Sequence, residues 1–431
     1  MKLKHRLVII GILLVVFAII TPVTILLTRG YRYDFSNHRL VKTGALIVKT
    51  LPRGAKIFLN DKLYGSTPDT IRFLIPGEYK VLLKKAGYKP WEKTLSILPE
   101  QVVFAHPKDK KITLFLEQPK LERISTGTID FIYTSNHLVY WYATSTVNFF
   151  DNETKKEIRT NFPYKEPQKI GIEVAADGVW AFLQNQYQDF LINLEDNQAY
   201  DITFVPGRII KAASLNSREV LLLTDKANLY KLNPKSKTLT LLREEVASFQ
   251  FSKDRLYYVQ AGLLYAADPN GSSEELLAEF PVKNFHNFQI IPTDGSFIFV
   301  IADGNLYFIA EELKLLDQNI TNASWNEEAE QLLYFNLSGI WLFDPQSGKR
   351  SQLITRSSDP IRQAFFNPVT DQIFYLQGNK IKAIEAHGQV TRAIVELINP
   401  SDAIEKFATD SRGKHLYFLT STQELFSAQI R

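Results

Sequence analysis

A short stretch of the chain contains the residues that most resemble a ligand-binding loop. Gly65-Ser66-Thr67 could form part of a phosphate-binding loop, in which backbone N–H groups hold the anion. Such a loop needs a GxxxxGK[ST] sequence between a strand and a helix, so that the helix N-terminus faces the phosphate. Here Pro68 follows directly, no lysine comes next, and the chain continues into another predicted strand. We therefore interpret the glycine of this stretch as a turn residue and not as a nucleotide site.

The other residues that could do chemistry are scattered. Cysteine is absent, which excludes disulfides, thiolate ligands and a cysteine nucleophile. Asp268 to Glu275 lacks the alternating carboxylates of a calcium loop, and no GxSxG or SxxK places an activated serine on a suitable turn. The histidines show no i,i+4 or HExxH spacing; they are His5, His38, His106, His137, His286, His387 and His415. We predict no catalytic, metal or cofactor site.

Tryptophans offer a second kind of site, a platform on which a sugar ring could stack. Trp141, Trp180 and Trp341 fall in repeated strand positions, where packing inside the protein is the favoured interpretation. Trp325, in "NASWNEE" near the turn that ends a predicted inner strand, is the best candidate for an exposed ligand contact. It is the single ligand-contact residue that the sequence suggests.

Charge and composition limit the function further. The 431 residues are 45% hydrophobic and 22% charged, which is typical of globular domains. The first 42 residues contain seven basic residues and one acidic residue, an excess larger than the net charge of +4 of the whole chain, so the remainder is slightly acidic. Because nucleic-acid binding depends on clustered Lys and Arg, we predict no nucleic-acid partner.

The N-terminal region predicts a single membrane-spanning helix. Leu7 to Leu27 contains no charged residue, and its length is that of a bilayer core. A cleaved signal peptide is the alternative, but the apolar run is longer than a signal core and no small-x-small cleavage site follows. The short basic tail, residues 1–6, favours a cytoplasmic N-terminus, which places all residues after Leu27 outside the cytoplasm.

After a linker at residues 28–43, residues 44–118 read as short strands with turn residues between them. The predicted strands are Ala45 to Thr50, Ala55 to Asn60, Thr70 to Ile75, Glu78 to Lys84, Glu92 to Leu98 and Lys111 to Glu117. Asn60-Asp61 suits a hairpin, and Pro76-Gly77 suits the centre of a type II turn.

This region resembles the PEGA domain family. "TLPRGAKIFLNDKLYGSTP" followed by "IPGEYKVLLKKAGYKPW" contains the family's Pro-x-Gly-Ala, Gly-x-Thr-Pro, Pro-Gly-x-Tyr and Gly-Tyr elements in order, with Arg53 where the motif has glutamate. The resemblance implies a small β-sandwich in a bacterial envelope or surface protein, without catalytic residues.

Residues 119–431 contain an internal repeat of about 40 residues, the length of a four-stranded propeller blade. A five-residue pattern recurs eight times, from "VNFFD" at Val147 to "LFSAQ" at Leu425, and a second apolar run precedes each copy. The region resembles β-propellers of the WD40-like or TolB-like kind. We expect about eight blades, with seven as the alternative. Because the chain ends after "LFSAQIR", we expect Lys120 to Thr126 to supply the outer strand of the last blade and so close the ring.

The predicted fold class is therefore all-β apart from one transmembrane helix. We expect a non-catalytic, single-pass cell-envelope protein whose sandwich and propeller lie outside the cytoplasm and bind a surface protein, peptide or glycan. One alternative is a scaffold or sensor ectodomain that regulates a membrane complex. A propeller glycosidase or lyase is the other, and it would need several acids or histidines around the channel.

Overall fold

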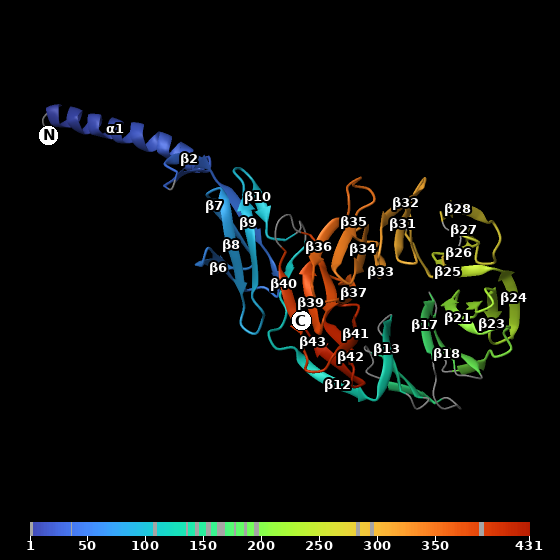
Figure 1. Ribbon diagram of the computed structural model, residues 1–431. Helices are drawn as coiled ribbons and strands as arrows, with labels where there is room; N and C mark the ends of the chain where they lie inside the picture. Colours follow the sequence, from blue (N-terminus) through green and yellow to red (C-terminus); the bar gives the residue numbers. More distant parts are fainter. Residues whose placement is uncertain are drawn as a thin grey trace.

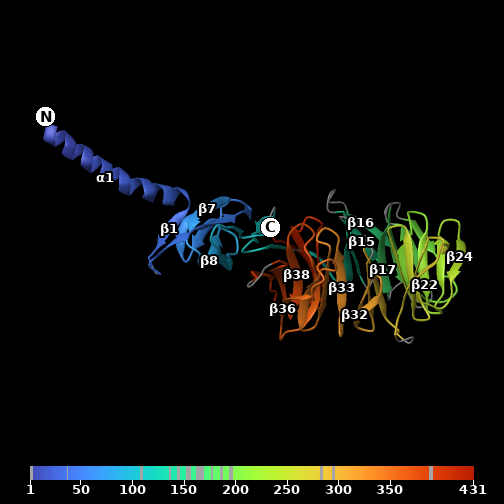
Figure 2. The same cartoon turned by 90° about the horizontal axis from the view of Figure 1, so that it is seen from above.

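The structure is a computed structural model of the chain. It describes residues 3–35, 37–106, 110–134, 137–142, 146–151, 157–161, 169–175, 178–184, 188–193, 198–281, 285–293, 297–387 and 392–431. Helix, sandwich and ring follow one another along an elongated molecule (Figures 1 and 2).

The N-terminal helix α1 (Leu3–Thr28) projects away from the rest of the molecule (Figure 1). Its segment Ile9–Thr28 has a mean hydropathy of 2.9 and none of it is buried, which gives it the length and composition of a membrane-spanning helix or a signal sequence. The region that we expected to be a linker contains a hairpin of β1 (Tyr31–Asp34) and β2 (Arg39–Lys42). The guanidinium of Arg32 in this hairpin lies 4.2 Å from the centre of the Phe73 ring, so the hairpin contacts the sandwich.

The sandwich consists of three small sheets around one apolar core. The strand orders are β10-β3-β7, β11-β4 and β6-β5-β8-β9, and β10 and β11 run parallel to their partners. The bounds are β3 (Gly44–Val48), β4 (Thr50–Leu51), β5 (Lys56–Leu59), β6 (Lys62–Ser66), β7 (Asp69–Leu74), β8 (Gly77–Lys84), β9 (Trp91–Ile97), β10 (Val102–Phe104) and β11 (Ile112–Thr113).

Two local predictions for the sandwich were wrong. The strand expected from Lys111 to Glu117 is only two residues long, because after Leu114 the backbone no longer pairs along β4 and bonds instead to Gly87, Lys89 and, in the ring, Ile430. The Pro76-Gly77 pair does not form a type II turn, since the φ of Gly77 is 157° and that turn needs about 80° at this position. The predicted hairpin at Asn60-Asp61 is confirmed: both residues have positive φ, as a type I′ turn requires.

In the part of the chain that the structure describes, the strands after residue 119 form eight four-stranded antiparallel sheets, here called blades. Seven blades follow chain order: β13 (Thr128–Thr134), β14 (His137–Tyr142), β15 (Thr146–Asp151), β16 (Glu157–Asn161); β17 (Lys169–Ala175), β18 (Gly178–Gln184), β19 (Asp189–Asn193), β20 (Gln198–Asp201); β21 (Ile209–Ser214), β22 (Val220–Thr224), β23 (Leu229–Asn233), β24 (Thr238–Arg243); β25 (Val246–Ser252), β26 (Arg255–Gln260), β27 (Leu263–Ala267), β28 (Glu275–Glu279); β29 (Phe288–Pro292), β30 (Ile298–Ala302), β31 (Asn305–Ile309), β32 (Leu313–Asp317); β33 (Asn322–Asn326), β34 (Gln331–Asn336), β35 (Gly339–Phe343), β36 (Gln352–Arg356); and β37 (Ile361–Phe366), β38 (Gln372–Gln377), β39 (Lys380–Glu385), β40 (Ile394–Ile398). The last contains β41 (Ile404–Thr409), β42 (His415–Thr420), β43 (Glu424–Gln429) and β12 (Lys120–Thr126).

The blades are arranged in a ring, with first strands such as β21 near the centre and fourth strands such as β24 at the outside (Figure 1). The two apolar runs found in the sequence repeat are the second and third strands of each blade. Second strands such as β22 and β38 are buried almost throughout, because both of their faces pack against neighbouring blades; all five residues of β22 are buried.

The closing strand was predicted correctly. β12 pairs antiparallel with β43, and Glu122 lies opposite Ser427 in the register. A strand from the start of the ring thus completes the blade made by the end of the chain. The outer edge of β43 is covered by this pairing, which removes an exposed strand edge.

Candidate functional site

The glycine-containing stretch that suggested a phosphate loop is used inside the sandwich. Gly65 and Ser66 lie in β6, so Gly65 is a strand residue and its interpretation as a turn residue was wrong, and Thr67 is 3% exposed. The hydroxyl oxygen of Thr67 accepts the N–H of Ala55 at 3.1 Å and lies 2.5 Å from the hydroxyl of Thr50. These bonds tie neighbouring segments of the sandwich together and leave no anion cradle at Thr67.

The sandwich and the ring are joined by the segment 115–117, which forms backbone hydrogen bonds to both. Its first carbonyl accepts the N–H of Lys89 at 2.8 Å, and its last N–H donates to the carbonyl of Gly87 at 2.9 Å. Its central N–H donates to the carbonyl of Ile430 in the ring, also at 2.9 Å. The segment is therefore held from both sides just before β12 begins.

Each domain also places an apolar residue in the other domain's core. Phe115 is 1% exposed and belongs to the core of the last two blades, with its ring centre 6.0 Å from that of Phe374. Ala393, which precedes β40, packs in the sandwich core together with Trp91. This exchange buries apolar surface that would otherwise face water, and so stabilises one arrangement of the two domains.

A buried ion pair lies at the centre of the joint. The Nζ atom of Lys93 in β9 is 2.6 Å from Oε2 of Glu385 in β39, and the two side chains are 9% and 13% exposed. The indole Nε1 of Trp91 donates to Oε1 of the same carboxylate at 2.9 Å. Glu385 thus receives bonds on both oxygens from the sandwich, which fixes the side chain across the domain boundary.

A second charged side chain at the joint has buried donors without hydrogen-bond partners among the described residues. Arg392 has its Nε and Nη2 atoms buried, and neither has a hydrogen-bond partner in the part of the chain that the structure describes. Burial lowers the pKa of this guanidinium, and attraction to Glu385 opposes that change. The joint therefore contains one satisfied ion pair and one guanidinium with unsatisfied donors.

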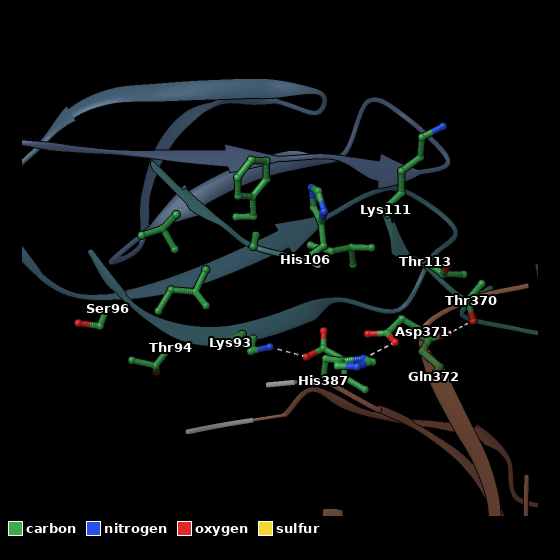
Figure 3. A pocket seen from close by; sticks show the side chains of 16 residues that line it. Lys93, Thr94, Ser96, His106, Lys111, Thr113, Thr370, Asp371, Gln372 and His387 are labelled. Atoms are coloured by element: carbon green, nitrogen blue, oxygen red, sulfur yellow. Dashed lines mark hydrogen bonds and ion pairs between the residues drawn. The ribbon is translucent and has the colours of Figure 1, made fainter. Parts of the chain in front are cut away.

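A cavity of about 410 Å³, here called the joint cleft, opens between the sandwich and the ring (Figure 3). Strands β9, β10 and β11 supply the sandwich wall, and the β37–β38 turn with the end of β39 supplies the ring wall. Its charged and hydrogen-bonding side chains include Lys93, Lys111, His106, Asp371, Glu385 and His387.

One acid–base pair lies in the joint cleft. Nδ1 of His387 is 2.5 Å from Oδ1 of Asp371, and the backbone N–H of Ala386 donates to the carbonyl of Asp371 at 3.1 Å (Figure 3). A histidine oriented by a carboxylate is one half of a nucleophilic site, and the other half is a hydroxyl or thiol within bonding reach. The nearby Thr370 hydroxyl donates to Oε1 of Gln372 at 3.1 Å instead. The observed contacts therefore indicate that the His387–Asp371 pair connects two loops of one blade.

Trp325, the sequence-predicted ligand contact, is half-buried and not fully exposed. It lies in β33, the first strand of its blade, near the turn as predicted. Its ring stacks on Phe299 of the preceding blade, with ring centres 5.7 Å apart and an interplanar angle of 30°. Trp180 and Trp341 are packed as expected: Trp180 is 4% exposed, and Trp341 stacks on Tyr334 at 5.6 Å.

Trp325 nevertheless lines a second cavity of about 400 Å³, which we call the blade-turn cleft. It lies where the β33–β34 turn and the β37–β38 turn are neighbours, with Lys110 from the sandwich side at its border. Its lining residues are Lys110, Ser324, Trp325, Asn326, Glu327, Glu328, Ala329, Phe365, Phe366, Asn367, Pro368, Thr370 and Asp371. Because Thr370 and Asp371 also line the joint cleft, the two cavities adjoin.

Polar side chains on the inner strands of the ring bond across blade boundaries. Nζ of Lys211 donates to the carbonyl of Phe249 at 2.6 Å, and Nζ of Lys406 lies 2.9 Å from Oδ1 of Asp130. A third cavity, of about 390 Å³, lies between the blades that begin with β21, β25 and β29 and is lined by Lys211 and His286 among others. Lys211, Lys406 and Asp130 therefore form structural bonds between blades.

No group of three or more His, Cys, Asp and Glu side chains that could hold a metal ion occurs among the described residues. Two histidines of the described chain each lie against a single carboxylate, His387 on Asp371 and His415 on Asp410.

Comparison with known proteins agrees with this architecture. Residues 43–107 match the model of the PEGA domain family. No curated protein sequence matches the chain.

Two solved structures show the fold of the ring. The C-terminal WD40 domain of Sif2 superposes with a TM-score of 0.54 at 12% identity, covering 72% of this chain and 98% of that domain. The computationally designed protein Ika8 superposes with a TM-score of 0.52 at 10% identity, with the same coverage of 72% and 98%. At such low identity the likeness concerns the fold alone. Residues 43–107 are therefore a PEGA domain, and the blades that follow have the fold of a WD40-like β-propeller.

Proposed function

We propose that this protein is a non-catalytic, membrane-anchored envelope protein whose PEGA domain and propeller lie outside the cytoplasm and bind a surface protein, peptide or glycan. The observation that carries the proposal is the joint. A buried ion pair, exchanged core residues and the segment 115–117 hold the propeller in one orientation on the PEGA domain. A rigid connection of this kind suits a domain that presents a binding surface at a fixed distance from a membrane.

The anchor is supported by the apolar surface of α1. Its segment Ile9–Thr28 has no side chain buried against the rest of the chain, so in water it would expose a long apolar surface. Insertion into a bilayer removes this apolar surface from water. The basic tail that precedes the helix favours a cytoplasmic N-terminus. The β1–β2 hairpin then connects the helix directly to the PEGA domain.

A non-catalytic role is supported by the way polar groups are used. Lys406 and Asp130 pair with each other at the ring centre, and His387 with Asp371 in the joint cleft. In each case the bond joins two blades or two loops. Three clefts of roughly equal volume, by contrast, lie between blades or between domains, where binding proteins commonly take their ligands.

The experiment that tests this function measures membrane topology, and the absence of cysteine makes it direct. His5→Cys and Glu311→Cys place a single thiol at the N-terminal tail or on an exposed turn of the propeller. In spheroplasts, a membrane-impermeant maleimide should label Glu311→Cys at once and His5→Cys only after lysis.

The intact chain should also stay in the membrane pellet after carbonate extraction, with its N-terminus retained by mass spectrometry. Labelling of His5→Cys alone in spheroplasts would contradict the orientation. Release of a shortened chain without α1 would show a signal peptide instead of an anchor.

A further inference from the structure

We propose that the blade-turn cleft binds an extended segment of a partner protein that carries a basic side chain. This deepens the proposed function, on which it rests, by assigning the binding surface and the partner's chemistry. The argument uses the unsatisfied polar atoms in the cleft, the orientation of its aromatic rings, the charge at its rim and its continuation into the joint cleft.

Three polar side-chain atoms that belong to lining residues are buried and have no hydrogen-bond partner within the described chain: Oγ of Ser324, Nε1 of Trp325 and Nδ2 of Asn367. Asn367 as a whole is 2% exposed, and its Oδ1 accepts the N–H of Val369 at 3.0 Å. That bond fixes the orientation of the Asn367 amide, so its Nδ2 group remains a hydrogen-bond donor without an acceptor in the described chain. Buried donors are normally satisfied, so these atoms favour a ligand that supplies acceptors, such as the carbonyl groups of a peptide.

Two aromatic rings of the cleft, Trp325 and Phe365, are each packed against a ring of a neighbouring blade. Trp325 has Phe299 stacked on its ring, and Phe365 has Phe407 at 4.8 Å with an interplanar angle of 32°. A sugar ring binds on an open aromatic face, whereas a backbone carbonyl accepts a hydrogen bond from an indole edge. The packing of these rings therefore favours a peptide over a glycan.

The rim of the cleft is acidic. Glu327 and Glu328 lie on the β33–β34 turn with side chains 57% and 77% exposed, and Asp371 lines the opposite turn beside His387. Glu327 is already paired with Lys253, whose Nζ lies 2.8 Å from its Oε1, so Glu328 is the rim carboxylate that a basic segment reaches first. Lys110 is the only basic residue among the described lining residues, 3.6 Å from Glu328 and thus loosely paired. An incoming Lys or Arg can replace Lys110 at this carboxylate, so charge complementarity selects a basic segment.

The joint cleft continues this surface past the shared residues Thr370 and Asp371. Each cavity has a volume near 400 Å³, which is enough for one or two side chains with their backbone. A chain that crosses both cavities must be extended, since it runs from the turns of the ring toward the wall of the PEGA domain. The partner segment would thus contact both domains.

Binding is tested with the full chain in detergent micelles and three pools of acetylated, amidated hexapeptides. The pools differ only in carrying Arg, Gln or Glu at the third position, each followed by Phe or Leu. Fluorescence anisotropy gives the affinity. Fluorine NMR of 5-fluorotryptophan-labelled protein gives the location, since the chain has five tryptophans and Trp→Phe variants assign them.

We expect the Arg pool to bind about tenfold more tightly than the Glu pool and to shift the fluorine signal of Trp325. Glu327→Gln/Glu328→Gln should lower the affinity for the Arg pool about threefold to tenfold and leave the affinity for the Gln pool unchanged. Trp325→Phe, which keeps a ring but removes the N–H donor, should weaken all pools about twofold to tenfold. Lys110→Gln should raise the affinity for the Arg pool, because Glu328 then has no lysine beside it and can pair with the peptide.

Glu311→Gln/Glu312→Gln and Trp341→Phe are matched controls, since they remove the same groups elsewhere on the ring and should change nothing. Equal affinity for the Arg and Glu pools would overturn the proposal. Binding that leaves the Trp325 signal in place would also overturn it, as would capture of a soluble chito-oligosaccharide without any peptide. If no pool binds while the thiol labelling shows the expected topology, the cleft is not the binding surface and the proposed function stands.

Discussion

Lys93 of the PEGA domain and Glu385 of the propeller form an ion pair of 2.6 Å with both side chains largely removed from water. The two residues are 292 positions apart in the sequence, so their contact depends on the way the two domains pack. A charge in such a site costs much free energy if its partner is lost, because the remaining charge stays buried and unpaired. The stability of the joint should therefore respond strongly to single changes at this pair.

Lys93→Met should destabilise the joint by about 3 kcal/mol, the lower end of the range for breaking a buried pair. Trp91 still donates to the Glu385 carboxylate and limits the loss. The measurement is urea unfolding of the full chain in detergent micelles, together with hydrogen exchange of the segment 115–117, which should become faster. Lys93→Met/Glu385→Met should recover part of the loss, because no unpaired charge stays buried, while the Trp91 indole N–H loses its acceptor and keeps the recovery incomplete.

The control is the exposed pair of Lys80 and Glu92, 3.1 Å apart with side chains 47% and 51% exposed. Lys80→Met should cost less than about 1 kcal/mol, since water screens this pair. If Lys80→Met and Lys93→Met destabilised the protein equally, the burial of the joint pair would have no special role.

Arg392→Met should make the protein more stable. The variant removes two buried guanidinium nitrogens without partners while it keeps a long apolar side chain. Unsatisfied buried donors cost about 1–3 kcal/mol, so a rise of about 1 kcal/mol in the free energy of unfolding is expected. Thermal unfolding of the variant measures this, with the exposed Arg356→Met as the matched control. A lower midpoint for Arg392→Met than for Arg356→Met would show that the guanidinium is stabilising where it lies.

Acid should weaken the last blade through Asp410. Burial raises the pKa of this carboxyl, but hydrogen bonds from the His415 side chain and from the backbone N–H groups of Lys414 and His415 outweigh burial, and its pKa is lowered. A carboxyl with a lowered folded-state pKa stabilises the protein above its unfolded pKa, near 4. That contribution is lost as the pH falls below about 4 through the folded-state pKa.

Asp410→Asn should therefore be less stable than the unaltered protein at pH 7, and the difference should shrink as the pH falls from about 4. Urea midpoints measured from pH 7 to pH 2.5 test this. Asp254→Asn, a change at an exposed turn residue, should show no such convergence. A difference that stays constant with pH would mean that the charge of Asp410 is not involved.

The repeats made the ring predictable from sequence. The second strand of a blade is apolar because both of its faces are buried, so Val220 to Thr224 and its equivalents were visible as continuous runs. The turn at Asn60-Asp61 was visible because few residue pairs accept two positive φ angles. These features depend on residues within one strand or one turn.

The sites were less predictable because they depend on distant residues. The burial of Trp325 comes from Phe299 in the preceding blade, and no local pattern indicates that stacking. The joint cleft depends on a contact between the two domains, in which residues of β9 bond to Glu385 at the end of β39, and no local sequence pattern encodes that contact. The hairpin at Tyr31–Asp34 and Arg39–Lys42 was missed because its residues are too few and too polar to give a clear alternating pattern.

Closure of the ring by β12 gives the sharpest test of the fold, since Glu122 and Ser427 are opposite each other in the antiparallel register. Opposite residues in such a pair are close enough for a disulfide, and the natural chain has no cysteine that could compete. Glu122→Cys/Ser427→Cys should therefore form an intramolecular disulfide under mild oxidation, seen as a mobility shift on a non-reducing gel. The crosslink closes a very long loop and should stabilise the ring by up to about 5 kcal/mol.

Glu122→Cys/Glu424→Cys, with the second thiol opposite Thr126 instead, should not crosslink. Crosslinking of both pairs with equal yield would mean that β12 is not held in this register and that the ring closes in another way.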